Sequence, residues 1–134
     1  MREIVWDTET TGIMPGDGHR IVEIGAVEMI NRTVTGRTFH TYVDPQRPMP
    51  KDAERVHGLS SDFLTGQPIF EQVVDGFLEF IGDAPLVAHN AAFDFSVIRA
   101  SHDYYGMAYP EFSYLCSVKL AQRHWPDLGS HRLN

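Results

Sequence analysis

The sequence has few of the features that mark several large classes of protein. Its single cysteine, Cys116, leaves no possibility of an internal disulfide, which fits a reducing cytosol and predicts a cytoplasmic protein. No apolar run is long enough to span a bilayer, and no basic segment followed by a long apolar stretch predicts a secretory signal. Positive charge is also scarce, because 11 lysines and arginines face 18 aspartates and glutamates.

The resulting net charge of −7 limits how the protein could bind nucleic acid. Proteins that bind through broad counterion release carry a basic face, which this composition does not favour. A protein that holds a few nucleotides at a metal-filled pocket remains possible, because bound cations attract phosphate themselves. The 134 residues, 43% hydrophobic and 22% charged, are sufficient for one soluble domain with a buried core.

Apolar patterns predict alternating strands and helices. Strands are expected at 2–7, 21–30, 37–43, 85–89 and near 114–116, and helices at 52–56, 69–81, 91–104 and 118–124. The first three strands, with turns at 12–20 and 31–36, should form an antiparallel meander. Glu23 lies inside an otherwise apolar strand and therefore requires a partner. This order predicts one α/β domain with a mixed sheet flanked by helices.

Two acidic residues end the first predicted strand. Asp7 and Glu9 are two positions apart, so their side chains emerge on the same face of the strand, while Thr8 points away. Their Cα atoms would lie roughly 6.5–7 Å apart, close enough for both carboxylates to reach one divalent cation or a pair of them. The alternative is an acidic strand end that runs into a polar turn stabilised by residues 10–12.

A third acidic residue, Asp94, falls in the first turn of the helix expected at 91–104. An aspartate there can stabilise a helix N-terminus through the macrodipole. A lone carboxylate between Phe93 and Phe95 is nevertheless unusual and suggests a ligand. Sites in parallel α/β units form at the C-terminal ends of strands, so three carboxylates converge if the strands at 2–7 and 85–89 are neighbours.

Five separated segments resemble, in order and spacing, the DEDD 3′→5′ exonucleases of the DEDDh type. The segments are VWDTETTG, IVEIGAVEMINRTVTGRTFHTYVDP, VHGLS, LVAHNAAFDFSVI and LCSVKLAQRHWP. Within that family they are most similar to the proofreading epsilon subunits of bacterial DNA polymerase III. The resemblance implies a ribonuclease H-like fold and two-metal phosphodiester hydrolysis that releases nucleoside 5′-monophosphates from a 3′ end.

The resemblance also assigns residues. Asp7, Glu9 and Asp94 would hold two divalent cations, with Asp7 bridging both, Glu9 on the cation that activates water and Asp94 on the other. Hard carboxylate oxygens suit Mg²⁺ or Mn²⁺, and the chain has no thiolate cluster for zinc. The family's nucleotide pocket corresponds to Thr10, Thr11, Gly12, Asp52, His57, Asn90 and Phe93. Phe93 would lie beside the terminal base, although its position equally fits a core residue on a helix face.

The family's third motif is a histidine followed five residues later by an aspartate, on a late helix. It supplies the general base and the remaining metal ligand, and the sequence ends at Asn134 before it. We therefore expect an exonuclease domain over 1–134 that lacks the last helices of the fold and has impaired activity, with its general base unknown and expected beyond Asn134. Truncation is favoured over a naturally short protein or a segment supplied by another chain. His57 and His89 lie near the expected site, but the pattern gives neither of them the role of general base. Four other histidines are interpreted as surface or core residues: His19, His40, His102 and His124.

The expected function is thus proofreading 3′→5′ exonuclease activity on DNA. The implied partners are a single-stranded DNA 3′ end, a nucleoside monophosphate product, and the catalytic and small accessory subunits of a replicative polymerase, with no membrane. An exonuclease of the same superfamily that trims RNA would carry the same motifs. A non-catalytic domain that binds a polymerase or a nucleotide is the alternative of another class. Metal-dependent hydrolysis of a labelled single strand separates an enzyme from a binding domain.

Overall fold

The computed structural model describes residues 1–12, 18–89, 91–106 and 114–116. Its elements follow one another as β1 (Arg2–Thr10), β2 (Ile21–Ile30), β3 (Thr33–Tyr42), α1 (Lys51–His57), α2 (Ser61–Leu64), α3 (Phe70–Ile81), β4 (Leu86–Ala88), α4 (Ala91–Tyr104) and β5 (Tyr114–Cys116). The helix expected at 118–124 lies outside the described residues. Within the described ranges, no helix is both long and apolar enough to cross a membrane.

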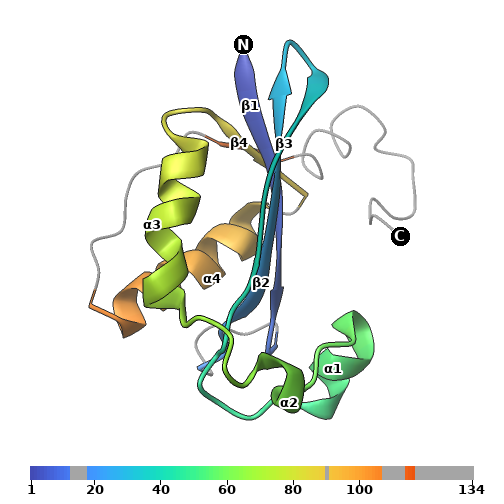
Figure 1. Cartoon of the computed structure of the whole chain (residues 1–134), viewed down its shortest axis with the longest axis vertical. Helices are drawn as coiled ribbons and strands as arrows, with labels where there is room; N and C mark the ends of the chain where they lie inside the picture. Colours follow the sequence, from blue (N-terminus) through green and yellow to red (C-terminus); the bar gives the residue numbers. More distant parts are fainter. Residues whose placement is uncertain (13–17, 90, 107–113, 117–134) are drawn as a thin grey trace.

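The five strands form one mixed sheet in the order β3-β2-β1-β4-β5. β1, β2 and β3 pair antiparallel, as the sequence predicts for a meander. β4 pairs parallel with β1, and β5 pairs parallel with β4. In Figure 1, α3 and α4 lie on one side of this sheet, and α1 and α2 lie near the C-terminal end of β1. The condition for bringing the two acidic segments together, that β1 and β4 are neighbours, is therefore met.

The β2–β3 hairpin is tighter than the sequence pattern predicts. The turn was expected to extend over 31–36, but β3 begins at Thr33. Asn31 and Arg32 close the hairpin with φ angles of +49° and +66°. Two consecutive residues with positive φ are typical of the two-residue turns whose twist matches that of paired strands. An arginine rarely adopts this conformation, which is why its position gave no turn signal.

The core lies between the sheet and α3. The buried residues of α3 follow the predicted helical face: Phe70, Val73, Val74, Phe77 and Ile81. The Phe77 ring packs 5.6 Å, centroid to centroid, from both Trp6 and Phe39. Trp6 and Phe39 come from β1 and β3, so α3 covers the sheet across three strands. We refer to this covered side of the sheet as the helix face.

An ionic cluster around the buried Glu28 fixes the end of the sheet remote from the candidate site. Glu28 accepts hydrogen bonds from Arg2 Nε at 2.5 Å, Thr35 Oγ1 at 2.8 Å and Arg37 Nη1 at 2.9 Å. The hydrogen bond from Arg2, the largest cause, lowers the pKa of Glu28. Arg2 also donates to the carbonyl oxygen of Ile81, so the same cluster ties the C-terminus of α3 to β1 and β2.

Candidate active site at the end of strand β1

Asp7 and Glu9 lie on the sheet face opposite α3, as their spacing predicts. Thr8, between them, is buried on the helix face, whereas Asp7 is exposed and Glu9 is half-buried. The register pairs Asp7 with Gly25 and Glu9 with Glu23 of β2. Directly paired residues of antiparallel strands share a face, so Glu23 adds a third carboxylate beside the first two. We refer to this side of the sheet as the site face.

The carboxylates on the site face repel one another. Partial loss of water is the largest cause that raises the pKa of Asp7, even though the residue remains exposed, and the charge of Glu23 adds to it. Burial also raises the pKa of Glu9, with further contributions from Asp7 and Glu23. The charge of His89 lowers the pKa of Asp7, so this histidine lies within electrostatic reach of the site. The site is therefore a place where a cation would relieve an existing repulsion.

Asp94 reaches β1 through an unexpected residue. The Thr8 hydroxyl donates a 2.7 Å hydrogen bond to Asp94 Oδ1. Asp94 is only 2% exposed, and burial is the main reason that its pKa rises to about 6. The charge of Asp7 raises this pKa further, so Asp7 and Asp94 interact although one lies on the site face and the other contacts Thr8.

Hydrogen bonds hold the turn that follows β1. Thr10 Oγ1 donates to the carbonyl oxygen of Gly12 at 2.7 Å, and the fully buried Thr11 accepts from the Arg20 backbone N–H at 3.0 Å. The Thr11 hydroxyl also lies 3.0 Å from Nδ1 of His19. A Cβ atom on Gly12 would lie 2.5 Å from the His19 ring, so this position requires glycine as long as that ring stays in place. The structure therefore brings the predicted pocket residues of this turn together.

His57 closes this turn from the other side. Its Nδ1 accepts a 3.0 Å hydrogen bond from the Leu59 backbone N–H, which leaves Nε2 as the protonated nitrogen of the neutral ring. Nε2 lies 3.1 Å from the Thr10 carbonyl oxygen, to which it donates. His57 thus lies beside the turn that follows Asp7 and Glu9, near the expected site as predicted. Asp52, which lies in α1 together with His57, is exposed and paired with Arg55.

Two predicted pocket residues lack a described side chain. Asn90 lies outside the described residues, and for Phe93 the structure describes the α4 backbone only. Within the described part of the chain, no three histidine, cysteine, aspartate or glutamate side chains gather closely enough to hold a metal ion. The described residues therefore supply a carboxylate pair on the site face and a third, buried carboxyl group held by Thr8.

Sequence reasoning missed three residues that contribute to the site. Thr8 was expected only to point away from the carboxylates, and its bond to Asp94 links segments 86 residues apart. Glu23 was expected to need a partner, and His40 Nε2 lies 2.5 Å from its Oε2. His40 and Tyr42 are two positions apart in the strand expected at 37–43, so they share a face. This spacing could have led to the Glu23–His40 pair once the register was known.

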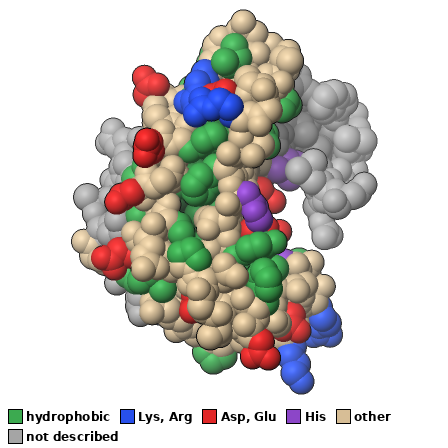
Figure 2. All heavy atoms as spheres, viewed as in Figure 1, with side chains coloured by type: hydrophobic (Ala, Val, Ile, Leu, Met, Phe, Trp, Pro, Cys, Tyr) green, Lys and Arg blue, Asp and Glu red, His purple; other side chains and the backbone are tan. Residues whose placement is uncertain are grey.

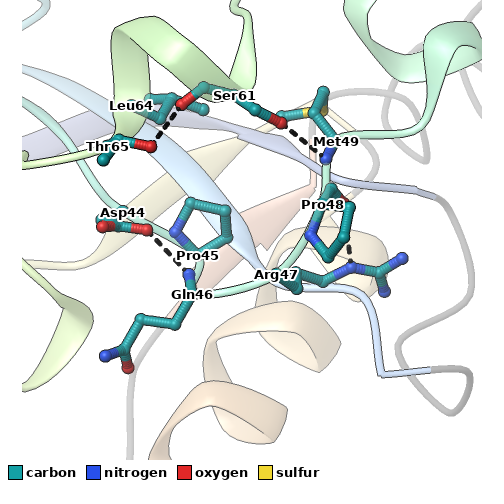
Figure 3. Close-up of a pocket in the computed structure, with 9 residues that line it drawn as sticks. All are labelled: Asp44, Pro45, Gln46, Arg47, Pro48, Met49, Ser61, Leu64 and Thr65. Atoms are coloured by element: carbon teal, nitrogen blue, oxygen red, sulfur yellow. Dashed lines mark hydrogen bonds between the residues drawn. The ribbon is translucent and has the colours of Figure 1, made fainter.

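A separate pocket of about 390 Å³ lies where the 44–49 segment meets α2 (Figure 3). Hydrogen bonds within the segment and to α2 shape it, including those from Gln46 N to Asp44 Oδ1 at 2.8 Å and from Met49 N to Ser61 Oγ at 2.9 Å. None of the predicted site residues lines this pocket. The hydrogen bond between Met49 and Ser61 holds α2 against the segment that follows β3.

Known proteins match this chain along most of its length. The model of the RNase T exonuclease family matches residues 4–134. The DNA polymerase III subunit epsilon of Rickettsia felis is 56% identical over 99 residues, which cover 74% of this chain and 43% of that protein. The subunit of the same name from Salmonella typhimurium is 42% identical over 133 residues, which cover 93% of this chain and 55% of that protein. The chain thus spans about half the length of the curated relatives that it matches.

Solved structures confirm the expected ribonuclease H-like exonuclease fold. Exonuclease X, solved in complex with 5′-overhanging duplex DNA, superposes with a TM-score of 0.75 at 28% identity, over 94% of this chain and 66% of that chain. The nuclease domain of 3′hExo, a DEDDh family member bound to rAMP, gives a TM-score of 0.80 at 18% identity, over 93% of this chain and 70% of that chain. The second likeness concerns the fold alone. Because the family model covers all but the first three residues, this chain belongs to the RNase T exonuclease family.

Proposed function

We propose that this chain is the catalytic part of a metal-dependent 3′→5′ exonuclease that proofreads DNA and releases nucleoside 5′-monophosphates. The observation that carries the proposal is the position of Asp7 and Glu9 at the C-terminal end of β1, with Asp94 following its parallel neighbour β4. Ligands of open α/β sheets bind at this edge. The epsilon-subunit names of the relatives support proofreading over other exonuclease roles.

The donor set fits two divalent cations. Asp7, Glu9 and Asp94 would hold them through carboxylate oxygens, the ligands that Mg²⁺ and Mn²⁺ prefer. All three residues have raised pKa values, so positive charge would stabilise their ionised forms. When bound, such cations supply a water of lowered pKa and stabilise the oxygens of an in-line displacement. Since the described residues hold no ready three-ligand group, Asp94 must move or further ligands must come from outside those ranges.

The terminal nucleotide is assigned to the surface beside this carboxylate pair. Its predicted contacts are Thr10, Thr11, Gly12, His57, Asn90 and Phe93, with Asp52 as a more distant one. The hydrogen bonds that join the turn after β1 to His57 and His19 support this assignment, because a fixed pocket orients the scissile bond. We assign the general base to none of the residues 1–134. A general base contributes about 10²–10⁴-fold, so we expect slow hydrolysis by this segment alone.

The names of the relatives also support a place in a replicative polymerase. We assign the chain's partners as a polymerase catalytic subunit and a small accessory subunit, with a single-stranded 3′ end as substrate. Such an enzyme would act in the cytoplasm, where bacterial DNA is replicated.

The test is release of mononucleotides from a 3′-labelled DNA single strand with Mg²⁺ or Mn²⁺. It compares this chain with a chimera extended by the C-terminal segment of the Salmonella typhimurium relative. We expect slow release by this chain, faster release by the chimera, and loss of both with Asp7→Asn. Asp83→Asn removes an exposed carboxylate away from the site and should leave both rates unchanged.

Two outcomes would contradict the proposal. Nucleotide binding without hydrolysis by either folded protein would favour the non-catalytic binding domain. Faster hydrolysis of RNA than of DNA of the same sequence would favour the RNA-trimming alternative.

A further inference from the structure

Three rings form a continuous ladder on the site face. His40 and Tyr42 of β3 meet edge to face with ring centroids 4.9 Å apart, and Tyr42 meets Phe63 of α2 in the same way at 4.8 Å. The ladder is open to solvent, because the His40 side chain is 49% exposed and Phe63 is 46% exposed. In Figure 2, a histidine, acidic side chains and hydrophobic side chains adjoin one another near the middle of the visible face.

The ladder stands beside the candidate active site. The register aligns Tyr42 with Glu23, which in turn pairs with Glu9. His40 is likewise aligned with Gly25, which pairs with Asp7. Two strand spacings therefore separate the rings from the catalytic carboxylates, or roughly 10 Å.

The β2 position between Asp7 and His40 carries no side chain. Gly25 lies between them in the register, and a Cβ atom placed on Gly25 would meet no other atom within 4 Å. Because Gly25 has no side chain, it places nothing beyond the backbone between the carboxylates and the ladder at this register position. A chain that ends at Asp7 and Glu9 can thus cross β2 without steric hindrance from this position.

We propose that His40, Tyr42 and Phe63 form a second subsite that binds the bases of a nucleic acid single strand just upstream of its 3′ end. The proposal rests on the proposed function, because it takes Asp7 and Glu9 as the place of cleavage. Bases stack on aromatic rings whatever their sequence, which suits an exonuclease that must accept any strand. The Glu23–His40 pair holds one ring of the ladder against the sheet.

A purely structural role for the ladder makes a different prediction. If the Tyr42–Phe63 contact only fastens α2 to β3, side chains that keep the apolar volume without a ring should preserve binding of a strand. Leucine at either position tests this distinction, since it retains apolar packing and removes the stacking surface. Tyr42→Phe retains the ring and removes only the hydroxyl.

The experiment measures equilibrium binding, so that its readout does not depend on turnover. Fluorescence anisotropy follows a labelled phosphorothioate oligothymidylate of about eight nucleotides, a length within the range of known single-strand sites, in the presence of Mn²⁺. Calorimetry follows thymidine 5′-monophosphate on the same proteins. Val34→Ala is the matched control, because Val34 is an exposed residue of the same strand outside the ladder. Circular dichroism confirms that each variant is folded.

We expect Tyr42→Leu and Phe63→Leu each to weaken oligonucleotide binding about fivefold or more, and to weaken mononucleotide binding less. Tyr42→Phe and Val34→Ala should stay within about twofold of the unaltered chain, by the same stacking argument. The proposal is overturned if the leucine variants bind the oligonucleotide normally, if both ligands weaken equally, or if Tyr42→Phe is as weak as Tyr42→Leu. The leucine substitutions could weaken oligonucleotide binding while neither this chain nor the extended chimera hydrolyses DNA. That result would reject the proposed function but support the subsite as a binding site.

Discussion

The hydroxyl of Thr8 donates to the carboxyl group of Asp94 across a 2.7 Å hydrogen bond that joins the acidic end of β1 to the first turn of α4. Thr8 faces the helix side of the sheet, while its neighbours Asp7 and Glu9 face the other side. The alternation of one strand therefore serves two purposes, presenting a carboxylate pair on one face and anchoring a third carboxyl group from the opposite face.

We predict that Thr8→Val destabilises the protein at pH 7, although valine has nearly the same shape as threonine. The substitution leaves the buried Asp94 without its hydroxyl donor, and hydrogen bonds to charged groups contribute roughly 1.5–3 kcal/mol. Urea denaturation measures the free energy of unfolding. Thr8→Ser keeps the donor and should recover most of the loss. An unchanged unfolding free energy in Thr8→Val would show that the bond contributes nothing.

The pKa of Asp94 predicts an unusual dependence of stability on pH in metal-free protein. Folding raises this pKa from 3.8 to about 6, so between these values the folded state holds a proton that the unfolded chain has lost. The contribution of Asp94 to stability therefore falls as pH rises through this window and stays low above it. Asp94→Asn should raise the free energy of unfolding at pH 7–8 by up to roughly 3 kcal/mol, since one pKa unit corresponds to about 1.4 kcal/mol.

Thermal denaturation between pH 4 and 8 in the presence of EDTA measures this effect. The asparagine variant should show a flatter profile than the unaltered chain over that range. Asp75→Asn serves as the control, because Asp75 is an exposed residue of α3. A variant that is less stable than the unaltered chain at pH 8 would contradict the sign of this prediction.

The sequence predicted the parts of the site that depend on local periodicity. The two-residue spacing of Asp7 and Glu9 determined their common face, and the strand-to-helix pattern placed Asp94 in a first helical turn, both of which the structure shows. The pairing of Thr8 with Asp94 depends on how β1, β4 and α4 come together, which no local pattern contains. The partner of Glu23 required the register of β2 and β3, since His40 is 17 residues away.

α2 and β3 differ most from the prediction, for a related reason. α2 is a four-residue helix and was not predicted, because one turn is too short to show a 3.6-residue period. The Phe63 backbone N–H donates to the Ser60 hydroxyl at its start, and the Met49 backbone N–H of the segment after β3 donates to the Ser61 hydroxyl, so tertiary contacts fix its place. The strand β3 was expected to begin four residues later than it does, because the hairpin turn uses Arg32 rather than a glycine.

We predict that Gly12→Ala disrupts the turn after β1. A Cβ atom at this position would lie 2.5 Å from the His19 ring, so that ring would have to leave its contacts with Thr11 and Arg47. Overpacking of this kind typically costs about 1–3 kcal/mol. In a double-mutant cycle, His19→Ala should remove much of the penalty of Gly12→Ala. Strictly additive losses would show that the ring is not the obstacle.

The last prediction concerns divalent cations. In metal-free protein, burial and mutual repulsion raise the pKa values of Asp7, Glu9 and Asp94, so ionisation of these groups opposes folding above their ordinary pKa values. A cation that binds only the folded protein reverses this effect, by about 2.7 kcal/mol at a concentration 100 times its Kd. We therefore expect Mn²⁺ to raise the Tm at pH 7.5, and to raise it less at pH 5, where protons compete for the carboxylates. Asp7→Asn should raise the Tm of the metal-free protein and largely abolish its response to Mn²⁺, whereas Asp83→Asn should change neither. If Asp7→Asn responded to Mn²⁺ as the unaltered chain does, the cation would bind elsewhere and Asp7 would lose its assigned role as a ligand.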